Sequence, residues 1–235
     1  MALEIDDRPS DSPYIARVWR GRSSGVEHMM SVATSHWELV VWSHRGRVHV
    51  AARGPETIAS VADVPDESES FGISFALGTS MPHLPVPGLV DTQVESPHAT
   101  AREFVLRGEH WSMPTFDNAE DFVGRLVREG VLARDPVVSA AVQDETPRVG
   151  VRSVQRRVAA ATGLTQGAIR QIERARQAAV LLGEGVAALD VVHRLGYYDQ
   201  PHLARSLKRF IGRTASQLRR ADAAQPLSLL YKTGV

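Results

Sequence analysis

The sequence feature that most constrains this fold is the run Asp199–Phe210, whose apolar residues recur at helical spacing. Leu203, Leu207 and Phe210 share one face of a helix because they are four and then three residues apart. Asp199 is a suitable N-cap, since its carboxylate can accept a hydrogen bond from a first-turn N–H group. The run therefore predicts an amphipathic helix with one buried face.

A shorter helix is predicted immediately before this run, at residues 189–195. Gly196 follows it and suits the left-handed backbone that ends many helices. Arg205 lies on the outer face of the later helix, two residues after an apolar anchor. A short helix, a glycine turn and a helix with arginine on its outer face are the parts of a helix-turn-helix.

The same pattern occurs earlier in the chain, offset by 49 residues. Val154 then aligns with Leu203, and Arg156 aligns with Arg205. Matches continue at the following glycine, threonine and apolar positions, so chance is a poor explanation. Residues 165–183 predict a connecting helix about 27 Å long. Since one turn of B-DNA is about 34 Å, the two units could enter successive major grooves.

Residues 195–214 resemble the second helix-turn-helix signature of the AraC/XylS transcriptional regulators, and residues 153–165 resemble the end of the first. The resemblance implies a DNA-binding domain of two helix-turn-helix units joined by a long helix. The segment 144–150 departs from the family pattern, and the first unit is expected to be shortened. The N-terminal part, with residues 35–38 and 81–85, more weakly resembles the family's cupin-type sensor domains.

Charge divides the chain in a way that favours nucleic-acid binding. Residues 148–221 hold 14 Lys and Arg against 4 Asp and Glu, a net charge of +10, and the rest of the chain carries −10. Thirteen of these basic residues are arginine, which suits bidentate recognition of phosphate and guanine. A solvated helical surface would not gather this bias in one third of the chain.

Two sets of side chains are the candidate DNA contacts, although solvent-facing arginines are the alternative interpretation. We expect the following to face bases: Arg152, Ser153, Gln155, Arg156, Gln200, Pro201, His202 and Arg205. We expect phosphate contacts from Arg157, Lys208 and Arg209. Pro201 has no donor, so its direct readout would be limited to an apolar contact such as a thymine methyl.

The short strands of the N-terminal part predict a small β-rich barrel or sandwich. The family resemblance implies that it is cupin-like, and with the all-α double helix-turn-helix domain after it the expected fold class is α+β. Strands are expected at residues 15–20, 29–33, 37–42, 47–52 and 71–77, with a hairpin turn at 44–46. The expected domains are a disordered leader (1–12), a β-rich sensor and dimerisation domain ending in a helix (13–134), a DNA-binding domain (135–222) and a C-terminal tail (223–235).

A helix is predicted from a capping box at Asp117–Glu120. Its apolar stripe consists of Phe122, Val123, Leu126 and Val127. We expect this stripe to contribute to a homodimer, with packing on its own domain as a nearly equal alternative.

A ligand pocket lined by the four tryptophans, Trp19, Trp37, Trp42 and Trp111, is one interpretation of the N-terminal part. Ordinary core aromatics are an equal alternative. Seven of the nine histidines are N-terminal, but no His-x-His pair occurs, so no metal site is expected. No cofactor is expected either.

These observations together predict a cytoplasmic, sequence-specific transcriptional regulator of AraC/XylS type that responds to an effector. Its partners would be double-stranded DNA, a small-molecule effector, a second copy in a homodimer, and RNA polymerase if it activates. No membrane partner is expected. Catalysis lacks a candidate constellation, so it is not predicted to be an enzyme. The alternative is a cupin-like small-molecule-binding protein or enzyme whose C-terminal helices mediate protein contacts.

Overall fold

The structure is a computed structural model that describes residues 2–142, 150–220 and 226–228. These residues pack as two compact units, each assembled from separate parts of the sequence. The β-rich unit comprises Met1–Val26, His36–Pro55 and Pro65–Gln166. The helical unit comprises Glu27–Ser35, Glu56–Val64 and Gly167–Val235. A β-sheet-rich region followed by helices confirms the predicted α+β class.

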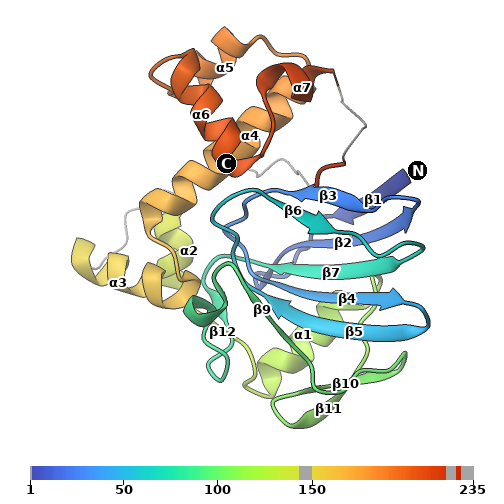
Figure 1. Ribbon diagram of the computed structural model, residues 1–235. Helices are drawn as coiled ribbons and strands as arrows, with labels where there is room; N and C mark the ends of the chain where they lie inside the picture. The colour runs from blue at the N-terminus through green and yellow to red at the C-terminus, as the bar shows by residue number, and fades with distance from the viewer. Residues whose placement is uncertain (1, 143–149, 221–225, 229–235) are drawn as a thin grey trace. The chain divides into compact units, whose positions relative to one another are not determined.

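The β-rich unit is built on an antiparallel six-stranded sheet with the strand order β1-β2-β7-β4-β5-β9 (Figure 1). Its strands are β1 (Ala2–Arg8), β2 (Ile15–Ser24), β7 (Glu69–Phe75), β4 (Glu38–His44), β5 (Arg47–Arg53) and β9 (Gln93–Glu95). The predicted strands at 15–20, 37–42, 47–52 and 71–77 correspond to four of these. The hairpin turn between β4 and β5 is also confirmed, with positive φ at Arg45 and Gly46. Within the described residues, this sheet ends in two edges, β1 and β9, and the cupin-like expectation is not confirmed.

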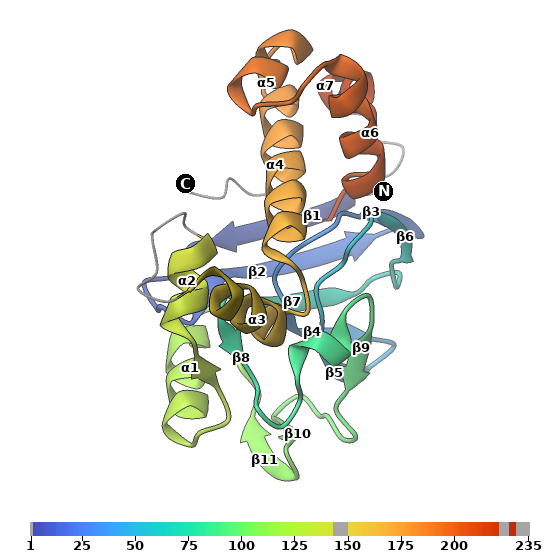
Figure 2. The ribbon, with the colours of Figure 1, turned by 90° about the vertical axis from the view of Figure 1, so that its left-hand side faces the viewer.

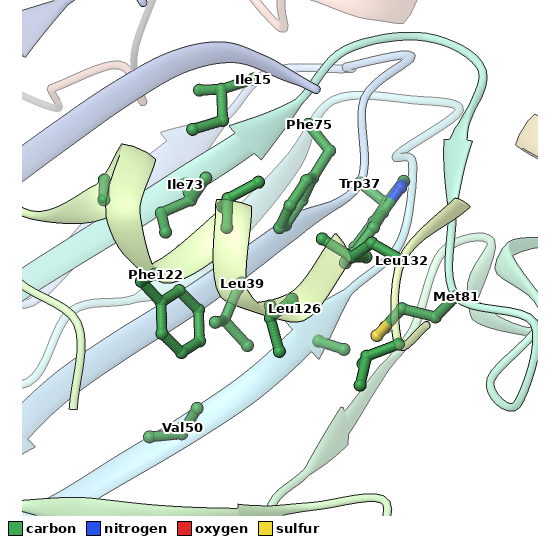
Figure 3. Close-up of a cluster of buried hydrophobic side chains, with 14 of the residues drawn as sticks. Ile15, Trp37, Leu39, Val50, Ile73, Phe75, Met81, Phe122, Leu126 and Leu132 are labelled. Carbon is green, nitrogen blue, oxygen red and sulfur yellow. The ribbon is translucent and has the colours of Figure 1, made fainter. Parts of the chain in front are cut away.

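The core of this unit lies between the sheet and helix α1 (Ala119–Arg128), which covers one face (Figures 1 and 3). Phe122 and Leu126 point from α1 toward Leu39 and Ile73 on the sheet, and all four are at most 8% exposed. Burying each such side chain is worth about 1.5–3 kcal/mol. The stripe predicted as a dimer surface is therefore largely buried in its own unit, and it does not provide a surface for a second copy.

Two expectations about the N-terminal region are wrong for a shared reason. The leader was expected to be disordered, but Ala2–Arg8 forms β1 and pairs antiparallel with Val18–Ser24 of β2. Asp6 pairs with Arg20 at 2.7 Å on the neighbouring strand. The capping box is also absent: the N-cap residue is Asn118, without a side-chain cap bond, and Glu120 instead accepts hydrogen bonds from Arg8 at 2.7 and 2.8 Å. The sheet thus uses the leader's charges in pairs that lie far apart in sequence.

Several short elements complete the β-rich unit. They are the hairpin β10 (Glu103–Leu106) and β11 (Glu109–Ser112), the pair β8 (Thr79–Ser80) and β12 (Ala133–Arg134), the turn η1 (Val86–Leu89), and the helices α2 (Pro136–Val142) and α3 (Val151–Thr162). Asp135 caps α2, because its side chain accepts a hydrogen bond from the Val137 N–H at 2.9 Å. Most of the segment 144–150 lies outside the described residues.

The helical unit consists of α4 with three shorter helices beside it (Figures 1 and 2). Its helices are α4 (Gln166–Gly183), α5 (Ala188–Arg194), α6 (Gln200–Phe210) and α7 (Ala215–Arg219). The connecting helix predicted at 165–183 is confirmed. At 1.5 Å per residue, the 18 residues of α4 span about 27 Å.

A two-stranded ribbon also belongs to the helical unit, although it comes from the N-terminal half of the sequence. Its strands, β3 (His28–Ser31) and β6 (Ser60–Asp63), pair antiparallel. The strand predicted at 29–33 exists, but it lies outside the sheet of the predicted sensor domain. The described part of the tail joins the ribbon, since Met30 and Leu227 form a parallel bridge. The predicted domain boundary after residue 134 differs from the division into the two compact units, which groups residues 27–35 and 56–64 with the C-terminal helices. The boundary stays a prediction.

Candidate nucleic-acid interface

The residues 188–210 form a helix-turn-helix whose turn is built from local signals. Gly196 ends α5 with φ +65°, a left-handed conformation that glycine adopts without steric cost. Asp199 caps α6, and its side chain accepts a hydrogen bond from the His202 N–H at 2.7 Å. Both features were predicted from the sequence, and both are confirmed.

Contacts from α4 and α6 hold this turn in place. The Arg174 guanidinium lies 4.5 Å from the centre of the Tyr197 ring, and it donates a hydrogen bond to the Gly196 carbonyl at 3.4 Å. The Tyr197 hydroxyl lies 3.1 Å from the Ser206 hydroxyl on α6. Burial raises the pKa of the Tyr197 phenol, so this group stays protonated over the ordinary pH range. The entry to α6 is therefore fixed before any ligand arrives.

The predicted division of α6 into a buried and an outer face is confirmed. Leu203, Leu207 and Phe210 are 2%, 0% and 6% exposed. The exposed residues include five of the predicted contacts: Gln200, Pro201, Arg205, Lys208 and Arg209. A helix with this pattern can enter a major groove without losing its packing on the rest of the unit.

His202 was predicted to face bases, and the structure gives its ring a second role. It is half-buried, lies edge-on to Tyr197 at 5.2 Å between ring centres, and accepts a hydrogen bond from the Tyr198 N–H at Nδ1. Because a backbone N–H can only donate, neutral His202 must carry its proton on Nε2. Any further bond from this ring is then a donated one, to an acceptor.

The C-terminal end of α6 is capped by the segments that flank the ribbon. The Ala33 N–H donates to the Phe210 carbonyl at 2.8 Å, and the Ala59 N–H donates to the Arg209 carbonyl at 2.8 Å. These bonds satisfy carbonyls that have no partner within the helix. Gly212 follows at φ +72°, where an added Cβ would overlap the Met30 side chain.

Polar side chains on α4 bind the residues that follow β3. Arg176 lies on the buried stripe of α4, is 2% exposed, and donates a hydrogen bond to the Ala33 carbonyl at 2.8 Å. The Ser35 hydroxyl donates to the Glu173 carboxylate at 2.5 Å. Because a buried guanidinium is costly unless its donors are bound, the bond from Arg176 favours the observed position of the segment 27–35 against α4.

Helix α3 carries the other predicted contacts and packs within the β-rich unit. Val154 and Val158 are buried, and Gly163 ends the helix at φ +72°. The residues predicted to face bases are exposed at Arg152, Gln155 and Arg156 and half-buried at Ser153. Arg157 forms an ion pair of 3.2 Å with Asp135, so a phosphate contact would have to replace that pair. The joint use of α3 and α6 on one DNA face stays a prediction.

The four tryptophans do not come together in one pocket. Trp37 stacks on Phe75 at 3.9 Å and, like Trp111, belongs to the core of the β-rich unit. Trp19 and Trp42 lie on the opposite face of the sheet, since side chains alternate along a strand and their neighbours Val18 and Val41 face the core. Trp19 lies over Gly72, and Trp42 stacks on His49. The open groove over β1, β2 and β7 is lined mainly by charged residues, which does not suit an apolar effector.

Several of the histidines have ordinary hydrogen-bond partners. His36, for example, is buried, and its ring Nδ1 lies 2.7 Å from the Phe75 carbonyl oxygen. Across the residues that the structure describes, no three His, Cys, Asp or Glu side chains are arranged to hold a metal ion. Within the same ranges, no helix has both the length and the apolar character needed to cross a bilayer.

Sequence reasoning missed the residues that position the site rather than those on its surface. Arg174, Arg176 and the ribbon gave no motif, because their partners lie elsewhere in the sequence. Tyr198 lies within the family signature at residues 195–214 but gave no prediction of a role, although it is 89% exposed at the entry to α6.

Comparison with known proteins agrees with this geometry. Residues 148–221, which include α3 to α7, match the family of helix-turn-helix domains of AraC type. No curated protein and no solved structure matches the chain. The matched domain supports a DNA-binding transcription regulator of AraC type. Domains of this family are generally not enzymatic.

Proposed function

We propose that the protein is a sequence-specific transcriptional regulator that reads DNA with α6 and, more weakly, with α3. One observation carries the proposal: a rigidly capped helix has Leu203, Leu207 and Phe210 buried and presents Arg205 on its outer face. The +10 charge of residues 148–221 supports the same conclusion, since a basic surface releases counterions when it meets phosphate. Such a regulator would act where the chromosome lies, in the cytoplasm.

In this mechanism the N-terminal part of α6 enters the major groove. Arg205 would pair with guanine O6 and N7, and Gln200 and Pro201 would meet neighbouring base edges. Lys208 and Arg209, near the C-terminal end, would bind phosphates and set the register of the helix on the duplex. On α3, Arg156 would have the role that Arg205 has on α6.

The proposal is tested with the full-length protein, because the ribbon that completes the helical unit comes from the N-terminal half. Duplexes are selected from a random pool, and binding is then measured against scrambled sequences at several salt concentrations. We expect a selected motif, tighter binding to it than to the scrambled duplexes, and log K falling linearly with log salt. Failure to enrich any sequence would reject the proposal in favour of helices that mediate protein contacts.

An effector would act on DNA binding through the ribbon. Residues 27–35 and 56–64 continue in sequence into strands of the β-rich sheet, and their Ala33 and Ala59 N–H groups cap α6. A shift of those strands would thus be felt at the end of the reading helix. If so, DNA binding should slow hydrogen exchange at these two amides. The factor by which an effector changes the affinity for DNA must also equal the factor by which DNA changes the affinity for the effector. Unchanged exchange at both amides would reject this route.

We also propose a homodimer, whose interface would lie outside the stripe of α1 because that stripe is buried. A dimer would place two copies of α6 on a two-fold site, and the selected motif would then be palindromic. Sedimentation of the protein with and without the selected duplex measures this; a monomer bound to a non-palindromic site would reject the dimer. RNA polymerase remains the proposed partner if the protein activates.

A further inference from the structure

Tyr198 combines high exposure with a fixed position. The residue is 89% exposed, yet its backbone N–H donates a hydrogen bond to His202. Of its two neighbours, Tyr197 has the Arg174 guanidinium over its ring, and Asp199 accepts a hydrogen bond from the His202 N–H. An exposed aromatic residue on a surface is unremarkable when it stands alone. Here the surrounding contacts fix the backbone of Tyr198 at the entry to α6, so the exposed side chain starts from a defined position.

The hydroxyl of Tyr198 is available for binding. Within residues 2–142, 150–220 and 226–228, no hydrogen bond engages it, whereas the hydroxyl of the preceding Tyr197 lies against Ser206. The two adjacent tyrosines thus have separate tasks. Tyr197 is buried and holds the turn, and Tyr198 presents a neutral donor to the surroundings.

We infer that Tyr198 is a DNA contact, in which its phenolic O–H donates to a phosphate oxygen at the rim of the groove that α6 enters. The N-terminal residues of a recognition helix contact base edges, so the turn just before them lies nearest to the flanking backbone. Tyrosine hydroxyls are among the groups that bind phosphate oxygens in such complexes. The inference rests on the proposed function of α6.

A neutral donor makes this contact distinguishable from those of the basic residues. Lys208 and Arg209 would release counterions, and their loss would lower the salt dependence of binding. Loss of the Tyr198 hydroxyl removes a hydrogen bond but no charge. Affinity should therefore fall without a change in the salt slope, and equally for every sequence.

The test compares Tyr198→Phe with the wild-type protein on a duplex selected by the wild type and on a scrambled duplex, at several salt concentrations. We expect affinity to fall about 5- to 30-fold on both duplexes, with an unchanged salt slope. Tyr14→Phe makes the same chemical change in the β-rich unit and should bind as the wild type does. Thermal unfolding should be the same for all three proteins, because the Tyr198 hydroxyl has no internal partner in the described chain.

Each other outcome overturns the inference in a recognisable way. Wild-type affinity in Tyr198→Phe would show that the hydroxyl contacts nothing, even if Tyr198→Ala then binds weakly through loss of the ring. A loss confined to the selected duplex would indicate a base contact instead. If the wild-type protein selects no duplex at all, the proposed function fails and the inference fails with it.

Discussion

Replacement of Arg205 by alanine tests the reading face of α6 directly. Among the described residues, no hydrogen bond or ion pair engages the Arg205 side chain, which is exposed opposite the buried stripe. Its removal should therefore change the free energy of unfolding by less than about 0.5 kcal/mol. Any loss of DNA affinity then belongs to the interface rather than to the fold.

The size of that loss follows from the contact proposed for the guanidinium. A bidentate pair with guanine is worth about 1–3 kcal/mol of discrimination against the wrong base. Arg205→Ala should accordingly weaken binding to the selected duplex about 5- to 150-fold and relax the preference at one base pair. Binding to scrambled duplexes should change far less.

Arg209→Ala is the matched control on the same helix. Its guanidinium lies over the Phe210 ring at 5.1 Å, and its carbonyl keeps the bond from Ala59 in the variant. As a phosphate contact it should weaken selected and scrambled duplexes alike and lower the salt slope by about one. Both variants are titrated on both duplexes across salt concentrations. Equal losses on the two duplexes for Arg205→Ala would assign it to phosphate and refute the reading face.

Three further predictions concern the supports of the fold. Asp199→Ala removes the cap of α6 and should lower the free energy of unfolding in urea by about 0.5–2 kcal/mol; an unchanged midpoint would contradict the cap. Hydrogen bonds from Arg8 lower the pKa of Glu120 to about 2. Because this pKa is depressed in the folded state, the ionised Glu120 adds to the free energy of unfolding. This stabilisation is complete above the unfolded pKa near 4.5 and is lost as the pH falls toward 2. The stabilisation amounts to about 1 kcal/mol after solvent screening. Glu120→Gln should remove this part of the pH dependence of the free energy of unfolding, and a variant with the same pH profile as the wild type would refute the prediction. Gly212→Ala puts a Cβ at φ +72° against a neighbouring side chain and should cost at least about 1 kcal/mol in thermal unfolding, whereas a neutral result would mean that the turn rearranges.

The parts of the fold that the sequence predicted are those whose causes are local. The stripe of α6, its cap at Asp199 and the glycine turn all involve residues within a few positions of each other. Positions of most strands also follow from local alternation and turn residues. The helix-turn-helix and its outer arginines were accessible for this reason.

What the sequence did not reveal depends on partners distant in the chain. Glu120 has the spacing of a capping residue, but Arg8 binds it from the first strand. The stripe of α1 has the same pattern whether it meets its own sheet or a second copy. Arg176 looks like one more basic residue of a DNA-binding region, yet it is buried against Ala33. Periodicity reports which face of an element is apolar, but it does not report what covers that face.

The ribbon has a consequence for how this helix-turn-helix could be inherited or engineered. The bond between Arg176 and Ala33 closes a loop of 143 residues, and such closure is slow and entropically costly compared with contacts between neighbouring helices. The helices α4 to α7 alone are thus not expected to keep their structure when they are moved to another protein. A transplant would leave the carbonyls at the end of α6 without the Ala33 and Ala59 donors, and the buried Arg176 without the Ala33 carbonyl. Exchange of DNA specificity between such proteins should therefore proceed through substitutions on the outer face of α6, with the interwoven chain left in place.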